Sequence, residues 1–156
     1  TLTTERVYSA FLGLPEEGRT FYYGHTYTGN PVGCAVALAS LDLFDTEHVI
    51  EGLAKKIQRL TTQLDSQMKH LRHVADIRQR GLMVGIELAR DPATRAAYAS
   101  DERIGARVTV AARAHNVIVR PLGDVIVLMP PLSIRLSEID LLVSAVCQAI
   151  VSVTET

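Results

Sequence analysis

The sequence has no tryptophan, only 5% aromatic residues and no excess of either charge, since its formal net charge at neutral pH is −1. Proteins that bind nucleic acids commonly rely on a basic surface and on aromatic rings that stack on bases. No apolar run approaches the roughly 18 residues of a membrane span, and no signal peptide is visible. We therefore expect neither a nucleic-acid partner nor a membrane association.

Cysteine is scarce as well, with Cys34 and Cys147 far apart in the sequence and both in apolar, helical surroundings. This pattern predicts two buried small hydrophobic residues rather than a disulfide, and it favours a reducing compartment, the cytoplasm. The chain has 156 residues, of which 47% are hydrophobic. That length allows one domain with a real core, or a small domain with an appended segment.

Several common catalytic motifs are also missing. The nucleophile elbow G-x-S-x-G is absent, and so are the glycine-rich nucleotide loops. His70 and His73 have no carboxylate or cysteine ligand nearby, so we expect no metal site. A nucleophilic lysine must be desolvated, whereas the lysines here lie on the polar side or at the end of a predicted helix. They are Lys55, Lys56 and Lys69.

Two helices are predicted in the first half of the chain. Asn30 is a favoured N-cap residue and Pro31 is suited to the first helical position, so a helix should begin there and continue to Phe44. Its residues are small and nearly all apolar, which predicts burial on several sides. A second helix is predicted from Glu47 to Leu71, with apolar residues at steps of three and four.

In the second half of the chain, apolar residues recur at every second position. Residues 74–90 predict a strand in which Gly81 forms a bulge, and Asp101 is suited to cap a helix that follows. The stretch "VIVRPLGDVIVLMPP" predicts two short strands around a turn. Ser137 should open the last helix, with Asp140 as its capping-box partner. This order favours an α+β domain: a small antiparallel or mixed sheet with helices on one side.

The turn from Gly24 to Pro31 is the first candidate site. Thr26 and Thr28 bring hydroxyls, glycines let a ligand approach the backbone, and the helix start favours an anion. The alternative is an ordinary loop followed by a helix cap. Both interpretations fit the spacing of these residues.

Arg120 is the second candidate. It ends an apolar strand and precedes Pro121, a position from which an arginine often holds a carboxylate with both arms of its guanidinium. The alternative is a structural ion pair with Asp124 across the turn. Neither interpretation is favoured by the residues alone.

The stretch "GHTYTGNPVGCAVALASLDLF" closely resembles the segment that follows the catalytic lysine in class III, pyridoxal phosphate (PLP)-dependent aminotransferases. The resemblance continues through "VADIRQRGLMVGIELARD" and "NVIVRPLGDVIVLMPPLSI", in the same order and over nearly the whole chain. It implies a fold-type I transferase. Residues 1–30 would end the large PLP-binding domain, and residues 31–156 would form a linking helix and the C-terminal small α+β domain.

The resemblance also implies roles for four residues. Thr26 would bond the phosphate of the PLP bound in the other subunit of a homodimer, helped by His25 or its backbone. Gly24 would lie beside the substrate, and Arg120 matches the arginine that binds the carboxylate of a keto-acid substrate. The family often has proline in place of His25, and some members have tyrosine in place of Val127, so a substrate contact through that side chain would be lost.

The block "IVRPLGDVIVLMPP", with "YASDERIG" before it, is most similar to the family members of biotin synthesis. Those enzymes move an amino group from S-adenosylmethionine to 8-amino-7-oxononanoate. Omega-amino acid aminotransferases have a similar block and are the alternative within the family. A different alternative is that the chain alone is a non-catalytic structural or dimer-forming domain.

The family's Schiff-base lysine lies upstream of the Gly24 turn, as do its cofactor-binding aspartate and its stacking aromatic residue. The resemblance therefore implies that this chain is the C-terminal part of an enzyme and contains none of its catalytic residues. We expect the 156-residue chain to be inactive by itself.

Overall fold

The computed structural model describes residues 2–155, and these fall into two compact units that divide between Asp42 and Leu43. The expected boundary after residue 30 differs from this division, which falls inside helix α2, Pro31–Thr46. That boundary remains a prediction about the domains of a longer protein.

The first unit contains the short helix α1, Glu5–Ser9, and a single turn of 3-10 helix, Pro15–Glu17. Thr4 caps α1 by accepting a hydrogen bond from the backbone N–H of Val7. The ring of Phe21 lies 5.4 Å from that of Phe11 and 5.8 Å from that of Tyr23, measured between centroids. Aromatic contacts therefore replace a true core in this unit, where no residue of α1 is buried.

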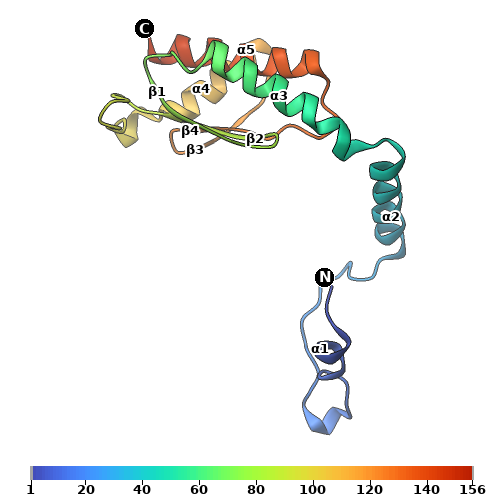
Figure 1. The fold of residues 1–156 in the computed structure, drawn as a ribbon. Coiled ribbons are helices and arrows are strands. Elements are labelled where there is room, and N and C mark those ends of the chain that lie inside the picture. Colours follow the sequence, from blue (N-terminus) through green and yellow to red (C-terminus); the bar gives the residue numbers. More distant parts are fainter. Residues whose placement is uncertain (1, 156) are drawn as a thin grey trace. The chain divides into compact units, whose positions relative to one another are not determined.

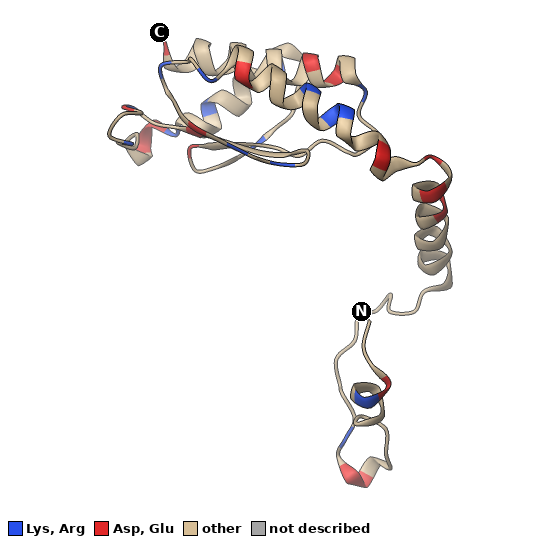
Figure 2. Ribbon diagram, viewed as in Figure 1, with Lys and Arg blue, Asp and Glu red and all other residues tan. Residues whose placement is uncertain are grey.

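The expectation that α2 is buried on several sides is wrong for this chain. None of its residues is buried, and Val32 and Val36 are 70% and 64% exposed. Cys34, also expected to be buried, is exposed. The helix is apolar around its whole circumference, so its burial needs neighbours on several sides, and the described residues do not supply them. Figure 2 shows α2 without charge except at its acidic C-terminal end.

The second unit is the expected α+β domain. Its helices are α3, α4 and α5, and its strands are β1 to β4. Their bounds are α3 Val49–Gln67, β1 Val74–Arg80, β2 Met83–Leu88, α4 Ile104–Ala112, β3 Arg120–Leu122, β4 Val125–Leu128 and α5 Leu136–Thr154, with 3-10 turns at Ser100–Glu102 and Arg113–His115. The sheet has the order β1-β2-β4-β3, and every pair is antiparallel. All three helices cover the same face of the sheet (Figure 1), which confirms the predicted fold class.

Residues 74–90 form a hairpin rather than one strand with a bulge at Gly81. Arg80 pairs with Met83, so Gly81 lies in the two-residue connection between β1 and β2. Its φ of +63° is a left-handed conformation that glycine adopts without steric cost. The irregular pairing lies instead between Val74 and Asp76.

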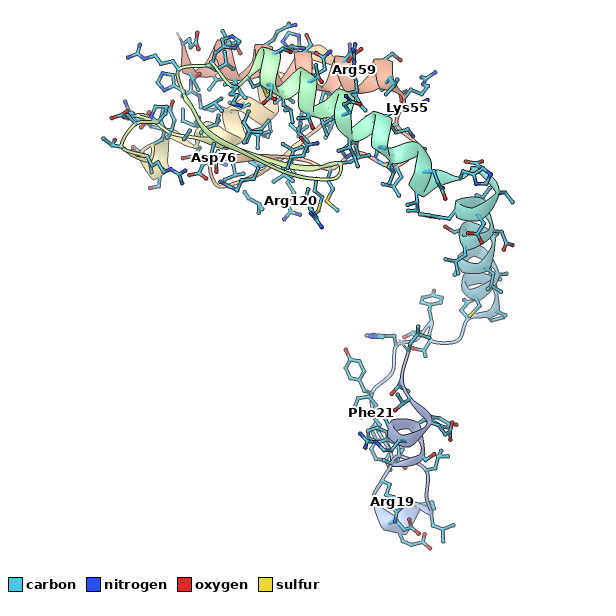
Figure 3. The ribbon with its side chains drawn as sticks, in the orientation of Figure 1. Arg19, Phe21, Lys55, Arg59, Asp76 and Arg120 are labelled. Atoms are coloured by element: carbon cyan, nitrogen blue, oxygen red, sulfur yellow. The ribbon has the colours of Figure 1, made fainter. Side chains whose placement is uncertain are left out.

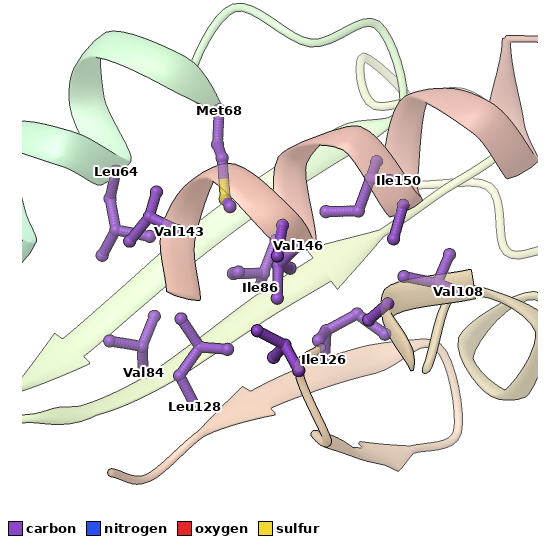
Figure 4. Close-up of a cluster of buried hydrophobic side chains, with 14 of the residues drawn as sticks. Leu64, Met68, Val84, Ile86, Val108, Ile126, Leu128, Val143, Val146 and Ile150 are labelled. Carbon is purple, nitrogen blue, oxygen red and sulfur yellow. The ribbon is translucent and has the colours of Figure 1, made fainter. Parts of the chain in front are cut away.

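The core forms between the helix layer and the facing side of the sheet (Figure 4). Alternate residues of the two central strands point into it, and they meet the inner faces of α3 and α5. Fully buried members include Leu60, Leu64, Ile86, Ile126, Val143, Val146 and Ile150. This period-two alternation leaves the other face of the sheet open for a different use.

Helix α5 is the one described helix that is long and apolar enough to cross a membrane, although no such segment was expected from the sequence. That property is one of length and composition only. Ile139, Val146 and Ile150 have no exposed surface and belong to the core, so α5 is the central packing helix of the second unit.

The start of α5 also differs from the prediction. Ser137 does not cap the helix. Arg135 precedes the first turn, and its backbone N–H donates to Glu138 Oε2 at 2.8 Å. Asp140, expected as the capping partner, accepts two hydrogen bonds of 2.7 Å from Arg59 of α3. The two helices are therefore joined by a bidentate ion pair at the edge of the core.

This ion pair predicts a stability that depends on pH. The hydrogen bonds from Arg59 lower the pKa of the Asp140 carboxyl below its ordinary value of 3.8. A pKa that is lower in the folded than in the unfolded chain stabilises the fold above the unfolded value, and this stabilisation is lost as the pH falls through the folded value. Asp140→Asn should therefore lower the free energy of unfolding at neutral pH. This loss of stability should become smaller as the solution becomes acidic.

Urea unfolding of the chain at neutral and acid pH measures this difference. Asp65→Asn is a matched control, because Asp65 meets Lys69 at 3.5 Å with both side chains more than half exposed. Exposed pairs contribute little, so the control should change stability less than Asp140→Asn. If Asp140→Asn lowered the free energy of unfolding equally at both pH values, the Arg59–Asp140 pair would not be the source of the pH dependence.

Candidate functional site

The candidate site in the first unit is the turn that leads into α2. His25 and Thr28 close it reciprocally: the backbone N–H of His25 donates to Thr28 Oγ1 at 2.9 Å, and the N–H of Thr28 donates to the His25 carbonyl at 3.0 Å. Gly29 follows with a φ of +70°, where a larger residue would be strained. Thr28 is therefore a structural residue of the turn.

Asn30 caps α2 as predicted. Its side-chain oxygen accepts hydrogen bonds from the N–H groups of Val32 and Gly33, at 2.9 and 3.3 Å. Its carbonyl accepts from the N–H of Cys34 at 2.9 Å, and Pro31 has no N–H. The first turn of the helix thus has its donors engaged, so an anion here would have to be held by the loop that precedes the helix.

Thr26 is the residue of this loop that remains available. Within residues 2–155 its hydroxyl has no hydrogen-bond partner, and the N–H groups of Thr26, Tyr27 and Gly29 donate to no backbone carbonyl. A hydroxyl and several unengaged N–H groups on one exposed turn suit a phosphate group. The loop therefore fits the phosphate of a cofactor such as PLP.

Gly24 and His25 frame this loop on its N-terminal side. A side chain at Gly24 would meet no atom within 4 Å, so the space beside its backbone is open. The His25 ring packs edge-on against Tyr23, with centroids 5.3 Å apart. Because its N–H is used inside the turn, His25 in this arrangement has its ring rather than its N–H available to a ligand.

Arg120 belongs to the second unit, where it is the first residue of β3. It pairs with Val127 of β4, whereas the next residue, Pro121, pairs with the buried Ile126. Since side chains alternate along a strand, Arg120 and Val127 lie on the face of the sheet that the helices leave open. Figure 3 shows Arg120 on that side.

Arg120 lines a cavity of about 860 Å³ whose other walls are almost entirely apolar. Its lining includes Val117, Ile118, Val119, Leu122, Val127, Leu128, Met129 and Leu141. Glu138, the acidic residue of the lining, is engaged with Arg135, which lowers the pKa of the Glu138 carboxyl by hydrogen bonding. A single cation beside an apolar wall suits a ligand that carries a carboxylate on a hydrocarbon chain.

The alternative of an Arg120–Asp124 ion pair does not occur. Within residues 2–155, Arg120 forms no ion pair at all. Asp124 instead directs its carboxylate to α4, where Oδ1 accepts the backbone N–H of Gly105 at 3.2 Å. Asp101, expected to cap this helix, lies in the preceding 3-10 turn. The cap comes from a residue 19 positions along the chain, which no local pattern could reveal.

The "YASDERIG" block holds the loop before α4 in place. Arg90 forms an ion pair with Glu102 and lies over the Tyr98 ring, 5.2 Å from its centroid. Glu102 also accepts the N–H of Ala99 at 3.0 Å, and its hydrogen bonds lower the pKa of its carboxyl. These contacts are internal to the loop, so they build its structure and do not form a second site.

The lysines offer no nucleophile. Lys69 meets Asp65 on the surface of α3, and Lys56 donates to the carbonyl of Leu132 at 2.6 Å. Lys55 is exposed on the same helix (Figure 3). His73 Nδ1 lies 3.2 Å from the Ala89 carbonyl, and the described part of the chain holds no group of His, Cys, Asp and Glu that could bind a metal ion.

Comparison with known proteins gives these sites a context. A family model described as aminotransferase class-III matches residues 1–150. The adenosylmethionine-8-amino-7-oxononanoate aminotransferase of Nitratidesulfovibrio vulgaris is 55% identical over 99% of this chain, which corresponds to 28% of that protein. The protein of the same name from Geobacter sulfurreducens is 50% identical over 99% of this chain and 34% of its own length. The chain therefore spans 28% to 34% of these two relatives.

Solved structures agree with this result. The crystal structure of adenosylmethionine-8-amino-7-oxononanoate aminotransferase from Methanocaldococcus jannaschii matches with a TM-score of 0.89 and 43% identity, over 97% of this chain and 34% of that one. A thermostable omega transaminase from Pseudomonas jessenii matches with a TM-score of 0.81 and 30% identity, over 90% of this chain and 31% of that one. Both kinds of protein thus share this fold.

Proposed function

The chain belongs to the class-III aminotransferases, and we propose that it is the C-terminal part of an enzyme that transfers an amino group from S-adenosylmethionine to 8-amino-7-oxononanoate in biotin synthesis. The observation that carries this proposal is the 55% and 50% identity, over 99% of the chain, to two proteins named for that reaction. The apolar cavity beside Arg120 supports it, because the proposed acceptor is a long hydrocarbon chain that ends in a carboxylate.

The proposed cofactor is PLP, which when bound supplies the electron sink for amino transfer. Thr26 would donate its hydroxyl to the cofactor phosphate, together with the unengaged N–H groups of the loop. Thr28 and Asn30 would keep that loop in shape. In the proposed homodimer, Thr26 serves the cofactor of the other subunit, while Gly24 leaves room for the substrate.

Arg120 would hold the carboxylate of the acceptor, so that its keto group is oriented toward the reacting centre. A bidentate guanidinium fixes both the position and the direction of a carboxylate. The apolar walls would exclude water from the hydrocarbon chain. We propose a cytoplasmic enzyme, in keeping with its two free cysteines, Cys34 and Cys147.

An omega-amino acid aminotransferase is the second candidate, favoured by the likeness to the Pseudomonas jessenii omega transaminase. The intact enzyme separates the two candidates. Stopped-flow absorbance of the bound cofactor should change on mixing with S-adenosylmethionine and should reverse with 8-amino-7-oxononanoate. A response to omega-amino acids, with none to S-adenosylmethionine, would favour the second candidate.

The isolated 156-residue chain should not catalyse transamination, even with added PLP and both substrates. Its three lysines lie on the surface of α3 or at its end and cannot serve as a desolvated nucleophile. Product formation would be followed by chromatography, with the intact enzyme as the positive control. Turnover by the purified chain would refute the proposal that the catalytic lysine lies elsewhere.

Thr26→Ala in the intact enzyme should release the cofactor. A hydrogen bond to a charged group contributes about 1.5–3 kcal/mol, which corresponds to roughly a ten- to hundredfold loss of affinity. Cofactor retained after dialysis is read from its absorbance. Thr26→Ser keeps the hydroxyl and is the matched control, which should retain the cofactor. If Thr26→Ala holds PLP as tightly as the wild type, the loop is only a helix start.

Arg120→Ala should raise the Michaelis constant for 8-amino-7-oxononanoate and leave the half-reaction with S-adenosylmethionine nearly unchanged. An unpaired carboxylate in a partly dry site costs about 2–5 kcal/mol. Arg120→Lys should recover little, because the bidentate geometry is lost. Arg113 is an exposed arginine that precedes β3, so Arg113→Ala is the control for the loss of one positive charge. Equal losses in both half-reactions would mean that Arg120 serves both substrates or the fold.

A further inference from the structure

Arg120 belongs to a short edge strand that has few hydrogen bonds to the rest of the sheet. Strand β3 has three residues, Arg120–Leu122, and it lies at the edge of the sheet with β4 as its one neighbour. Its central residue is Pro121, which has no N–H to donate to the ladder. The direction in which Arg120 points must therefore depend on further contacts of the β3–β4 hairpin.

One such contact joins the hairpin turn to the start of α4. A methyl group on Gly105 would overlap with the carbonyl oxygen of Gly123 and would come within 3.2 Å of Pro121 Cβ. Only glycine at position 105 lets the two backbones approach this closely. Gly123 itself has a φ of +56°, a left-handed conformation that glycine adopts without steric cost.

Asp124 fastens the same turn at two points. Its Oδ1 accepts the N–H of Gly105 in the first turn of α4, at 3.2 Å. Its backbone carbonyl accepts the N–H of Leu88 at the end of β2, at 3.0 Å. The hairpin is thereby tied to a helix and to a central strand, both of which have residues in the core.

We propose that Asp124 and Gly105 are positioning residues for Arg120. They fix the hairpin so that the guanidinium faces the apolar cavity in a single orientation. This inference rests on the proposed function, in which Arg120 holds the acceptor carboxylate. A bidentate contact requires both position and angle, and a displacement of about 1 Å far from the reacting atoms can cost up to about a hundredfold in rate.

The test uses the intact enzyme with Asp124→Ala, Asp124→Asn and, as a control, Asp101→Ala. Asp101 is an exposed acid just before the same helix, so its loss reproduces the change of charge without the cap. Asp124→Ala should raise the Michaelis constant for 8-amino-7-oxononanoate by about 10- to 100-fold. The half-reaction with S-adenosylmethionine and the retention of PLP should stay at wild-type values.

Asp124→Asn should restore most of the lost affinity, because an amide oxygen caps a helix about as well as a carboxylate. Hydrogen exchange gives a readout besides activity: the amides of Gly105 and Leu88 should exchange faster in Asp124→Ala and at the normal rate in Asp124→Asn. Gly105→Ala should produce the same selective rise in the Michaelis constant by a steric route.

Two results would overturn the positioning role. One is that Asp124→Ala lowers the rates of both half-reactions equally. The other is that Asp124→Ala and Asp101→Ala have the same Michaelis constant for 8-amino-7-oxononanoate although the amides of Asp124→Ala exchange faster. If Asp124→Asn behaves like Asp124→Ala, the charge rather than the cap is responsible, and the proposal fails. A wild-type enzyme inactive in both half-reactions would instead refute the proposed function, and with it the role of Arg120 on which the positioning depends.

Discussion

The one-sided burial of the four-stranded sheet determines which of its side chains enter the core and which face away from the helices. Ile86 and Ile126 point into the core because α3 and α5 cover that face. Side chains alternate along a strand, whereas directly paired residues share a face, so the residues next to Ile86 and Ile126 along each strand must point the other way. Arg120 and Val127 therefore face away from the helices as a direct consequence of the packing that stabilises the domain.

The same constraint explains the composition of the cavity beside Arg120. Part of the lining, including Val117 and Leu128, belongs to the core, whereas Ile118 before β3 and Met129 after β4 do not. Ile118 and Met129 are 85% and 73% exposed, although both lie in strongly apolar stretches. Exposed apolar surface of this extent is unusual unless a ligand or another surface uses it.

Local patterns were enough to predict much of this architecture. Apolar residues at steps of three and four predicted helix α3. A turn signal between two apolar runs predicted the hairpin around Gly123. The alternating apolar residues that predicted a strand, Leu82, Val84, Ile86 and Leu88, all follow Gly81, so the pattern did not show that residues 74–80 form a separate strand. The cap of α4 by Asp124 and the pairing of Asp140 with Arg59 join distant positions, so no local pattern could reveal them.

The two candidate sites share one physical principle: the neighbours that would compete for the functional group are already satisfied. In the turn, Thr28 accepts from His25 and Asn30 caps α2, which leaves the hydroxyl of Thr26 without an internal partner among the described residues. In the second unit, Asp124 of the hairpin turn accepts from Gly105 of α4 and Glu138 of the cavity lining is paired with Arg135, so neither carboxylate pairs with Arg120. A polar group without an internal partner exchanges only water when it binds a ligand, since no hydrogen bond within the protein must be broken first.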